Sequence, residues 1–464
     1  MDKIVVKFGG SNLKTISDIE RSAKIVKVYN QHIVVVVSAL YGVTNTIAKA
    51  MSEALLSPDE AGKIMHNLRL THFEAADACV TDASEKQSLL ETIDTRLTEL
   101  ERLLKGIHYI GAVPDFTHDK ILSYGERLAA PLVAAILRSQ GIAAREMMPE
   151  TIGLITDGKY GNATADLAAS SPLLKDALSF KETAVVPGFY GIAKDGGCAI
   201  FGRGGSDYTA AVIARCVGAS SLDLWKDVDG FLSSDPRIVP ESHTIPFLSY
   251  AEAAELSYFG AKILHPRTVE PLEDMFIPIR VMNVESPAGT IEPFTVVSSH
   301  QDKNETKSDV IKSVASSDDV GILRIEGPGV GSRPGILAWA AGRLDAASVN
   351  ISSVITAQTC INLIFKKDDL AKALAVLKAD SIGGVIAVEA IEDCAMVAAV
   401  GSGIRDSIGA GSAMLKALAD EGINVILAQA GASPVAMYVL VKNRDRENAV
   451  RAIHNMMGDE TWEK

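Results

Sequence analysis

The residues best suited to chemistry lie in one short stretch, 201–211, which reads FGRGGSDYTAA. Its glycines permit positive φ and a close approach of the backbone to a ligand. The apolar residues that follow can begin a helix, and the free N–H groups at a helix N-terminus attract anions. Arg203 adds a planar fork of donors that suits a carboxylate or a phosphate. The stretch predicts an anion site, with a plain loop capped by Ser206 or Asp207 as the alternative.

A second candidate is Lys7, which lies near the end of the apolar run 3–8 and just before Gly9, Gly10 and Ser11. A lysine beside a glycine turn can hold phosphate oxygens against backbone N–H groups. The alternative is a lysine on an edge strand that faces water. The Walker pattern GxxxxGK[ST] is absent from the sequence, so a nucleotide site here requires a different phosphate-binding fold.

A third candidate is Glu126, which opens a helical pattern that runs to residue 137. A carboxylate in the first turn of a helix is stabilised by the helix dipole, and this alone explains its position. The alternative is a carboxylate that binds the ammonium group of a substrate. The spacing of the sequence does not choose between the two.

These candidates depend on elements that bring them together. Strands are predicted at residues 3–8, 33–37, 184–186 and 221–225, and helices at 16–28 and 128–137. Such alternation is typical of an open α/β sheet with helices on both faces, in which ligands bind at the carboxyl ends of the strands. Residues 52–110 are helical in pattern, with an apolar stripe from Leu90 to Leu104, and predict a helical hairpin packed on the sheet.

The last third of the chain follows a polar linker at 298–309 and repeats a pattern. A strand at 320–326, a glycine loop, a helix at 336–346 and a strand from Val349 are followed by the same order from Val397. Two α+β modules of the βαββαβ type explain this repeat. The glycine loops lack the third glycine and the acidic partner of a dinucleotide site, so we reject that interpretation.

The composition limits the class of protein. The 464 residues carry 45 basic and 58 acidic side chains, a net charge of −13, which argues against nucleic acid or an anionic membrane as a partner. No apolar run approaches the about 20 residues of a membrane span, and no leader opens the sequence. The five cysteines are widely spaced, which favours the reducing cytoplasm. Neither cysteines nor histidines show metal-ligand spacing, so we expect no metal site built from side chains.

Taken together, the motifs resemble those of the aspartokinases along the whole chain. Six segments match the family's motifs in order: 7–11 (KFGGS), 38–45 (SALYGVTN), 123–126 (SYGE), 201–210 (FGRGGSDYTA), 225–237 (WKDVDGFLSSDPR) and 259–262 (FGAK). The resemblance implies an amino-acid-kinase domain at residues 1–297 and ferredoxin-like ACT domains at 310–385 and 394–460. It implies phosphorylation of the L-aspartate β-carboxylate by ATP with Mg²⁺, the first step toward lysine, threonine and methionine. Because the chain ends at residue 464, leaving no room for the homoserine dehydrogenase of some relatives, we expect a monofunctional enzyme.

The resemblance also implies roles for individual residues. Lys7 would hold the transferring phosphoryl group, with Asp207 orienting it, while Arg203 binds the α-carboxylate of aspartate and Glu126 its ammonium group. The other aspartate-binding residues would be Thr44, Gly204, Gly205 and Ser206, and the other nucleotide-binding residues Gly9, Gly10, Ser11, Lys226, Asp227, Arg237 and Lys262. A carboxylate is already a nucleophile, so such an enzyme needs alignment and neutralised repulsion rather than a strong base.

Three segments depart from the family's pattern. Asn12 stands where serine is usual, Leu232 where an aromatic residue near the adenine is common, and 356–360 (TAQTC) where a serine and an acidic pair are usual. An amino-acid effector, lysine before threonine, is expected at the ACT domains, and a homodimer or higher oligomer is expected from their sheet edges. The alternatives are a kinase of the same fold acting on glutamate, acetylglutamate or a nucleoside monophosphate, and a non-catalytic amino-acid sensor.

Overall fold

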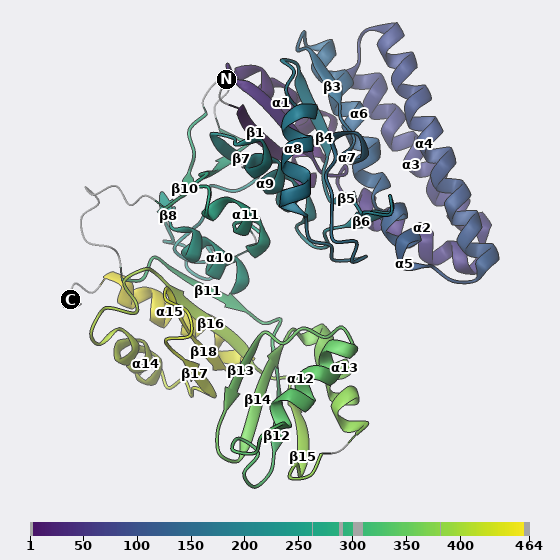
Figure 1. The fold of residues 1–464 in the computed structure, drawn as a ribbon. Coiled ribbons are helices and arrows are strands. Elements are labelled where there is room, and N and C mark those ends of the chain that lie inside the picture. Colours follow the sequence, from purple (N-terminus) through teal and green to yellow (C-terminus); the bar gives the residue numbers. More distant parts are fainter. Residues whose placement is uncertain (1–2, 262, 287–290, 300–309, 381, 459–464) are drawn as a thin grey trace. The chain divides into compact units, whose positions relative to one another are not determined.

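A computed structural model describes residues 3–261, 263–286, 291–299, 310–380 and 382–458 (Figure 1). Contacts divide the chain into two compact units. The first comprises Met1–Phe231, Thr244–Ser257 and Lys262–Lys303, and the second Leu232–His243, Tyr258–Ala261 and Asn304–Lys464. Among the described residues, no helix is both long enough and apolar enough to cross a membrane.

The first unit is built on an eight-stranded sheet of order β3-β4-β2-β1-β7-β9-β10-β8. Its strands are β1 (Lys3–Phe8), β2 (His32–Val37), β3 (Ala144–Glu146), β4 (Thr183–Pro187), β7 (Ser221–Lys226), β8 (Phe247–Leu248), β9 (Ile279–Asn283) and β10 (Thr295–Val297). All neighbours pair in parallel except β9 with β10. The central strands are valine-rich and buried on both faces, as expected for a parallel sheet covered by helices.

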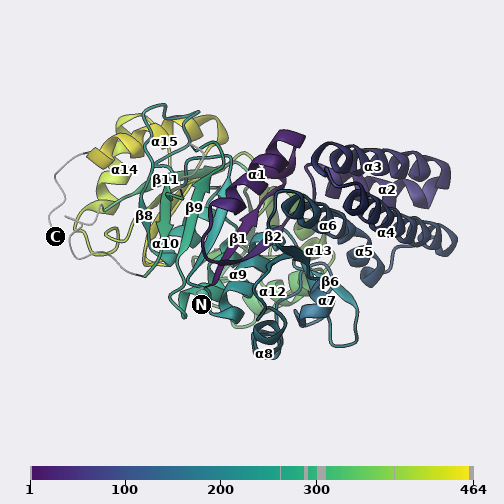
Figure 2. The same cartoon turned by 90° about the horizontal axis from the view of Figure 1, so that it is seen from above.

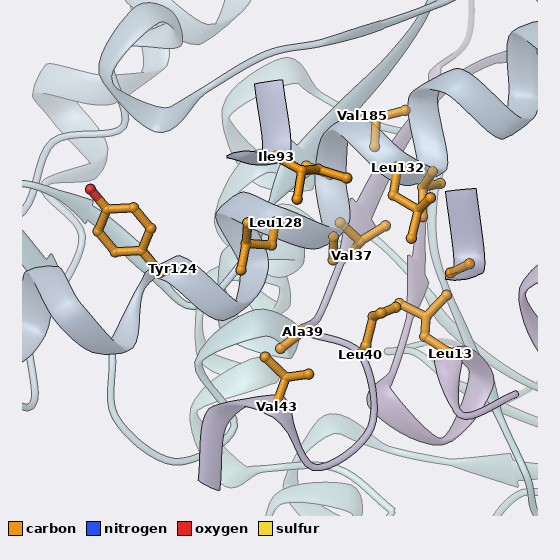
Figure 3. Packing of buried hydrophobic residues seen from close by; sticks show 14 of the residues in the cluster. Leu13, Val37, Ala39, Leu40, Val43, Ile93, Tyr124, Leu128, Leu132 and Val185 are labelled. Atoms are coloured by element: carbon orange, nitrogen blue, oxygen red, sulfur yellow. The ribbon is translucent and has the colours of Figure 1, made fainter. Parts of the chain in front are cut away.

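Helices cover both faces of this sheet. The helices of this part of the chain are α1 (Ile16–Val28), α2 (Val43–Leu56), α3 (Pro58–Cys79), α4 (Ala83–Ile110), α5 (Asp115–Leu122), α6 (Tyr124–Ser139), α7 (Pro149–Ile152), α8 (Leu167–Ala177), α9 (Gly205–Val217), α10 (Tyr250–Tyr258) and α11 (Glu270–Glu273), with the short hairpin β5 (Tyr190–Ile192) and β6 (Cys198–Ile200). Helices α1 and α6 lie on one side of the strands and α9 on the other (Figure 2). Val37 and Val185 of the sheet pack with Leu128 and Leu132 of α6 (Figure 3).

The helical hairpin is confirmed as α3 and α4, but it forms an additional layer. Asp82 caps α4 by accepting a hydrogen bond from the Glu85 N–H at 2.8 Å, and Gly111, with φ of 73°, ends it. The stripe from Ile93 to Leu104 is buried against α2, α3 and α6. The hairpin therefore packs on helices that cover the sheet, because α6 already occupies the sheet surface.

The second unit contains two four-stranded antiparallel sheets. The first follows the predicted βαββαβ order, with β12 (Gly321–Glu326), α12 (Ile336–Ala346), β13 (Ser353–Thr356), β14 (Cys360–Phe365), α13 (Lys367–Lys378) and β15 (Ala387–Ile391) in the sheet order β13-β14-β12-β15. Helix α12 has the predicted bounds. The second strand begins at Ser353 rather than at Val349, whose side chain is buried in the core of the module.

The other sheet departs from a simple tandem repeat. It comprises β16 (Ala395–Val400), α14 (Ala410–Asp420), β17 (Leu427–Gln429), β18 (Ala436–Val441) and α15 (Arg446–Asn455), in the sheet order β11-β16-β18-β17. Its edge strand β11 (Ser313–Ser317) precedes the first module and pairs antiparallel with β16. Val314 packs in the same core as Val397. Residues 321–391 therefore form a module inserted between β11 and the rest of its sheet, and β11 lies within the range 310–385 predicted for the first module.

Two segments from the predicted kinase region also belong to the second unit. Ile238 and Val239 are buried in the core that contains Val397. The Val314 N–H donates to the Ser233 carbonyl at 2.8 Å, and the hydroxyl of Tyr258 donates to the Ser352 carbonyl at 2.7 Å. Segments 232–243 and 258–261, which lie within the range 1–297 predicted for the kinase domain, therefore group with the second unit by their contacts. Most of the predicted linker, 300–309, lies outside the described residues.

A buried ionic network crosses the middle of the large sheet and generates a stability prediction. Asp223 is fully buried and accepts hydrogen bonds from the Tyr29 hydroxyl at 2.6 Å, the Ser221 hydroxyl at 2.8 Å and Arg280 Nε at 2.7 Å. Replacement of one partner of a buried ion pair leaves the other charge uncompensated, so Asp223→Asn should lower the free energy of unfolding by about 3 kcal/mol. Urea unfolding followed by circular dichroism measures it.

The matched control is Asp94→Asn, which breaks the pair between Arg69 Nε and Asp94 Oδ1 at 2.8 Å on the same unit. The Asp94 side chain is 53% exposed, so this change should cost less than about 1 kcal/mol. Equal effects of the two substitutions would contradict the importance given to the buried network.

Candidate functional site

The candidate site lies where the central strands of the large sheet end. Lys7 is on β1 and Lys226 ends β7, the neighbouring parallel strand, with Phe8 opposite Trp225 in the register. Helix α9 begins at Gly205 and contacts both strands, so Asp207 in its first turn reaches the same edge. The sequence prediction that the carboxyl ends of the strands gather these groups agrees with this geometry.

Asp207 bridges the two lysines. Its Oδ1 lies 2.5 Å from Lys7 Nζ and its Oδ2 lies 2.9 Å from Lys226 Nζ. The side chains of Lys7, Asp207 and Lys226 are only 5%, 9% and 15% exposed, so the pairing occurs in a poorly solvated place. The three groups together carry a net charge of +1, which suits an anionic ligand.

Burial and charge determine the protonation states of this cluster. Burial lowers the pKa of Lys7, and the positive charge of Lys226 lowers it further, while Asp207 opposes both effects. Burial alone would raise the pKa of Asp207, but Lys226 and Lys7 outweigh it and hold that pKa well below its usual range. Asp207 is therefore ionised near neutral pH and cannot serve as a general base. It is suited to orient the two lysines.

Glu126 is a buried carboxylate with unused hydrogen-bonding capacity. It lies in the first turn of α6 with 3% of its surface exposed, and its Oε1 accepts a hydrogen bond from the Ser206 hydroxyl at 3.3 Å. Burial raises the pKa of Glu126 to about 7, although the backbone of Ala39, the Ser206 hydroxyl and the charge of Lys7 oppose the shift. The buried Oε2 has no hydrogen-bond partner in the described part of the chain. An unpaired buried carboxylate oxygen can accept a hydrogen bond from a ligand or from a water molecule.

Two close packings bring the aspartate-site candidates together. A Cβ on Gly125 would lie 2.8 Å from Ala39 Cβ and 3.4 Å from the Thr44 hydroxyl, so Thr44 on α2 is held beside the start of α6. A Cβ on Gly188, at the end of β4, would lie 2.8 Å from Ser206 Cβ. Glycine is needed at both contacts because any side chain would separate the segments.

Arg203 stands apart from the buried cluster. It lies in the turn between Gly202 and Gly204, whose φ angles are 75° and 72°, and it is exposed. No hydrogen bond or ion pair within residues 3–458, the masked positions excepted, holds its guanidinium group. Gly204 and Gly205 follow directly and lead into α9. The fork of Arg203 is therefore available to an incoming anion.

The glycine turn after β1 uses one of its own N–H groups. The Gly9 N–H donates to Asn12 Oδ1 at 2.8 Å, and Asn12 is 1% exposed. A Cβ on Gly9 would lie 3.3 Å from Lys7 Nζ, which places the turn against the buried lysine. The N–H groups of Gly10 and Ser11 are thus better candidates for a phosphate than that of Gly9. The sequence marked Asn12 only as a departure, and its capping role appears in the structure alone.

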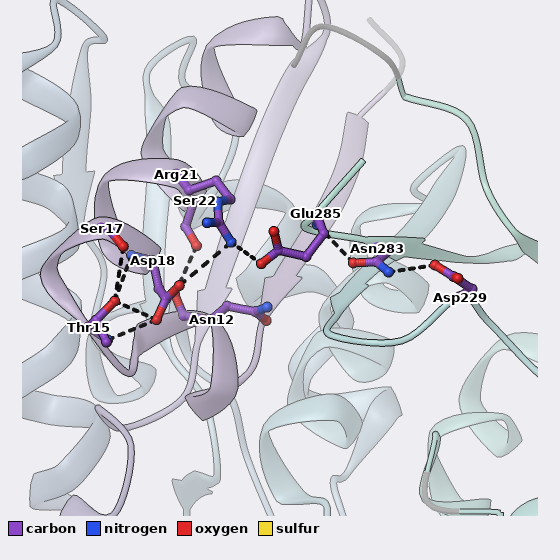
Figure 4. Close-up of polar contacts among 9 residues, drawn as sticks. All are labelled: Asn12, Thr15, Ser17, Asp18, Arg21, Ser22, Asp229, Asn283 and Glu285. Atoms are coloured by element: carbon purple, nitrogen blue, oxygen red, sulfur yellow. Dashed lines mark hydrogen bonds and ion pairs between the residues drawn. The ribbon is translucent and has the colours of Figure 1, made fainter. Parts of the chain in front are cut away.

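A chain of polar contacts supports the loop after β7 (Figure 4). Arg21 of α1 pairs with Glu285, whose N–H donates to Asn283 Oδ1 at 2.8 Å. Asn283 Nδ2 donates to Asp229 Oδ1 at 2.5 Å. These contacts tie the loop that carries the exposed Asp227 to the end of β9.

Three residues predicted in or near the nucleotide pocket lie outside the described residues of the first unit. Arg237 belongs to the second unit, pairs with Asp235 at 2.6 Å and has a side chain that is 87% exposed. Leu232, expected near the adenine, is also in that unit, where its carbonyl accepts a hydrogen bond from the Ser313 hydroxyl at 2.8 Å. Lys262 lies outside the described residues. The roles of these residues remain predictions.

Comparison with known proteins gives the wider context of this site. A model of the amino acid kinase family matches residues 2–283, and an ACT domain model matches residues 397–457. The chain is 30% identical to aspartokinase 1, chloroplastic, of Arabidopsis thaliana over 97% of its own length and 79% of that protein. It is 27% identical to the bifunctional aspartokinase/homoserine dehydrogenase of Haemophilus influenzae over 98% of its own length and 56% of that protein.

Solved structures agree with these relatives. Escherichia coli aspartokinase III in complex with aspartate and ADP, in the R-state, superposes with a TM-score of 0.82 and 26% identity, covering 98% of this chain and 99% of that one. The T-state structure of the same enzyme with lysine and aspartate has a TM-score of 0.79 and 27% identity, covering 99% and 100%. Because the family model covers more than half of the chain and the relatives match almost all of it, the chain belongs to the amino acid kinase family and, within it, to the aspartokinases.

Proposed function

We propose that this protein transfers the γ-phosphoryl group of ATP to the β-carboxylate of L-aspartate, the first step of lysine, threonine and methionine biosynthesis. The observation that carries the proposal is the buried Lys7–Asp207–Lys226 cluster at the same sheet edge as Glu126 with its unpaired oxygen. The choice of substrates is supported by the aspartokinase and bifunctional aspartokinase/homoserine dehydrogenase among the relatives, and by the aspartate and ADP bound to the E. coli enzyme.

In this proposal the charges of the site recognise both ends of aspartate. Arg203 binds the α-carboxylate with its exposed fork, and Glu126 accepts the ammonium group with the oxygen that lacks a partner. Thr44, Gly204, Gly205 and Ser206 line the space between them. The β-carboxylate then points to the phosphoryl donor and attacks without the help of a base.

The two lysines neutralise the charge of the transferring phosphoryl group. Lys7 contacts the phosphoryl oxygens, Lys226 acts beside it, and the ionised Asp207 keeps both ammonium groups in place. Gly9, Gly10 and Ser11 hold the phosphates, and Asp227, Arg237 and Lys262 contribute to the nucleotide pocket. We infer that Mg²⁺ enters as its complex with ATP, because Mg²⁺ is usually held by substrate phosphates together with one or two carboxylates.

We propose that the modules of the second unit regulate the activity. We also propose that the protein acts in the cytoplasm as a homo-oligomer. The E. coli T-state structure contains lysine, so lysine is proposed before threonine as the effector. The N–H groups of Gly327 and Gly331 donate to the carbonyls of Thr359 and Gln358 at 3.0 and 3.3 Å. The start of α12, rather than the whole glycine loop, is therefore the proposed contact for the effector's carboxylate.

The activity itself is tested with ATP, Mg²⁺ and hydroxylamine, which traps an acyl phosphate as a hydroxamate. Aspartate should give product and glutamate at least about 100-fold less, because the extra methylene displaces the nucleophile while Arg203 and Glu126 hold the other end. Lys7→Ala should abolish most turnover and serves as the control for contaminating kinases. Comparable rates on aspartate and glutamate would rule out the aspartokinase assignment.

The pKa of Glu126 predicts the pH dependence of aspartate use. The profile of kcat/KM reports ionisations of the free enzyme, in which the carboxyl group of Glu126 has a pKa of about 7. Below that pH the neutral acid no longer attracts the ammonium group, so kcat/KM for aspartate should rise up to about pH 7 and then level off. Glu126→Gln should remove this rise of kcat/KM with pH and lower kcat/KM at pH 8 by about 10- to 100-fold.

The matched control is Glu99→Gln, because Glu99 accepts a hydrogen bond from the Tyr124 hydroxyl at 3.1 Å but is not among the site residues. This variant should keep the rise of kcat/KM below about pH 7. If Glu126→Gln also kept this rise, the ionisation would belong to another group.

The effector proposal is tested by titrating lysine, threonine and methionine, singly and in pairs, against the initial rate. A coupling of about 1 to 3 kcal/mol would shift aspartate affinity about 5- to 150-fold. Leu337→Glu places a negative charge in the first turn of α12 and should weaken lysine inhibition, whereas Ser412→Glu in the first turn of α14 should not. Rates that stay constant at millimolar effector would leave the modules without a regulatory role.

A further inference from the structure

Arg267 makes an unusually complete set of contacts around the turn that carries Arg203. Its Nη1 donates to the Phe201 carbonyl at 3.0 Å and to Asn162 Oδ1 at 2.8 Å. Its Nη2 donates to the Ala163 carbonyl at 2.7 Å and to the Thr164 hydroxyl at 3.3 Å. All five residues belong to the first unit. One guanidinium group therefore ties segment 162–164 to the residue that begins the turn.

The same group also contacts the other end of the turn. The Arg267 Cζ lies 4.4 Å from the centre of the Tyr208 ring, a cation–π contact. Tyr208 is 3% exposed, packs edge-to-face on Phe201 with ring centres 5.1 Å apart, and directly follows Asp207. Arg267 thus touches both Phe201 and Tyr208, the residues that flank the segment 202–207.

The segment before Arg267 supports the middle of the turn. A Cβ on Gly204 would lie 2.4 Å from His265 Cβ, so His265 packs directly on the turn's backbone. The Arg267 N–H donates to His265 Nδ1 at 3.4 Å, and Pro266 restricts the backbone between them. Arg203 has no hydrogen-bond or ion-pair partner among the described residues, so the position of its guanidinium group depends on the turn that His265 and Arg267 support.

We propose that Arg267 is a positioning residue for aspartate: it holds the 201–208 turn so that Arg203 faces the substrate α-carboxylate while Asp207 stays on the two lysines. This inference rests on the proposed function for its choice of substrate. Arginine suits the task because its planar fork satisfies several carbonyl oxygens at fixed angles and stacks on an aromatic ring, which lysine cannot do. A displacement of about 1 Å in such a support can cost on the order of 100-fold in the reaction it serves.

The proposal predicts a selective kinetic defect. Arg267→Ala should raise KM for aspartate by about 10- to 100-fold while KM for ATP changes less than about threefold, because the turn carries the aspartate contact. Arg267→Lys should recover little of this loss. Added guanidinium chloride at low millimolar concentration should partly restore the aspartate KM of Arg267→Ala, whereas urea at the same concentration should not.

The matched control is Arg215→Ala at the opposite end of α9. Arg215 donates to the Pro271 carbonyl at 3.1 Å and pairs with Asp274, so it makes similar contacts away from the turn. It should alter thermal stability without changing either KM. Equal rises of both KM values in Arg267→Ala, or an unchanged aspartate KM, would overturn the proposal and leave Arg267 a structural role.

A second readout does not depend on turnover. Hydrogen exchange followed by mass spectrometry should show faster exchange of the 201–208 amides in Arg267→Ala than in wild type, and no change there in Arg215→Ala. If the wild type forms no aspartyl phosphate, the proposed function fails, and this exchange experiment still decides whether Arg267 holds the turn. If the exchange of the 201–208 amides were unchanged in Arg267→Ala, the positioning role of Arg267 would be wrong, whichever substrate the protein uses.

Discussion

The bridge from Asp207 to Lys7 and Lys226 is the interaction on which the site depends. Two ammonium groups held close together repel each other, and burial makes the repulsion stronger. A single ionised carboxylate between them, at 2.5 and 2.9 Å, offsets this repulsion and leaves one net positive charge. The three side chains come from β1, α9 and β7, so the parallel pairing of the sheet must form before the cluster can.

The same requirement explains why glycines are concentrated around the site. Gly125 and Gly188 allow α6 and α9 to approach the strand-end loops more closely than any side chain would permit. The positive φ angles of Gly202 and Gly204 turn the backbone so that Arg203 points outward while Asp207 enters the cluster. An acidic protein with a net charge of −13 thereby presents local positive charge to anionic ligands.

The two modules of the second unit do not simply follow each other along the chain. Strand β11 completes the sheet of the later module, and the module at 321–391 is inserted between that strand and the rest of its sheet. Segment 232–243, which continues from the loop after β7, is buried in the same core through Ile238 and Val239. A rearrangement of this core would therefore act directly on a segment that carries Arg237.

Much of the molecule was determined by the sequence alone. Valine-rich strands, amphipathic helices and glycine turns are local patterns, so the α/β class was predicted correctly, and β1, α1 and α12 have the predicted bounds. Lys7, Glu126 and Arg203 were selected as candidates because their residue types beside glycine turns suit anionic or ammonium ligands, and the family motifs added Asp207, Thr44 and the other nucleotide residues.

Only the tertiary structure decided which of these groups meet. Three kinds of contact join segments that lie 19 to 105 residues apart in the chain: the pairing of Asp207 with Lys226, the hydrogen bond from Ser206 to Glu126 and the contacts of Arg267. The assignment of β11 to the later sheet follows from strand pairing, which its short local pattern does not encode. The placement of Arg237 in the second unit follows from the burial of Ile238 and Val239 in a core formed mainly by later residues. Local sequence patterns determine where helices and strands form, whereas burial and strand pairing between distant residues determine which of these elements lie next to each other.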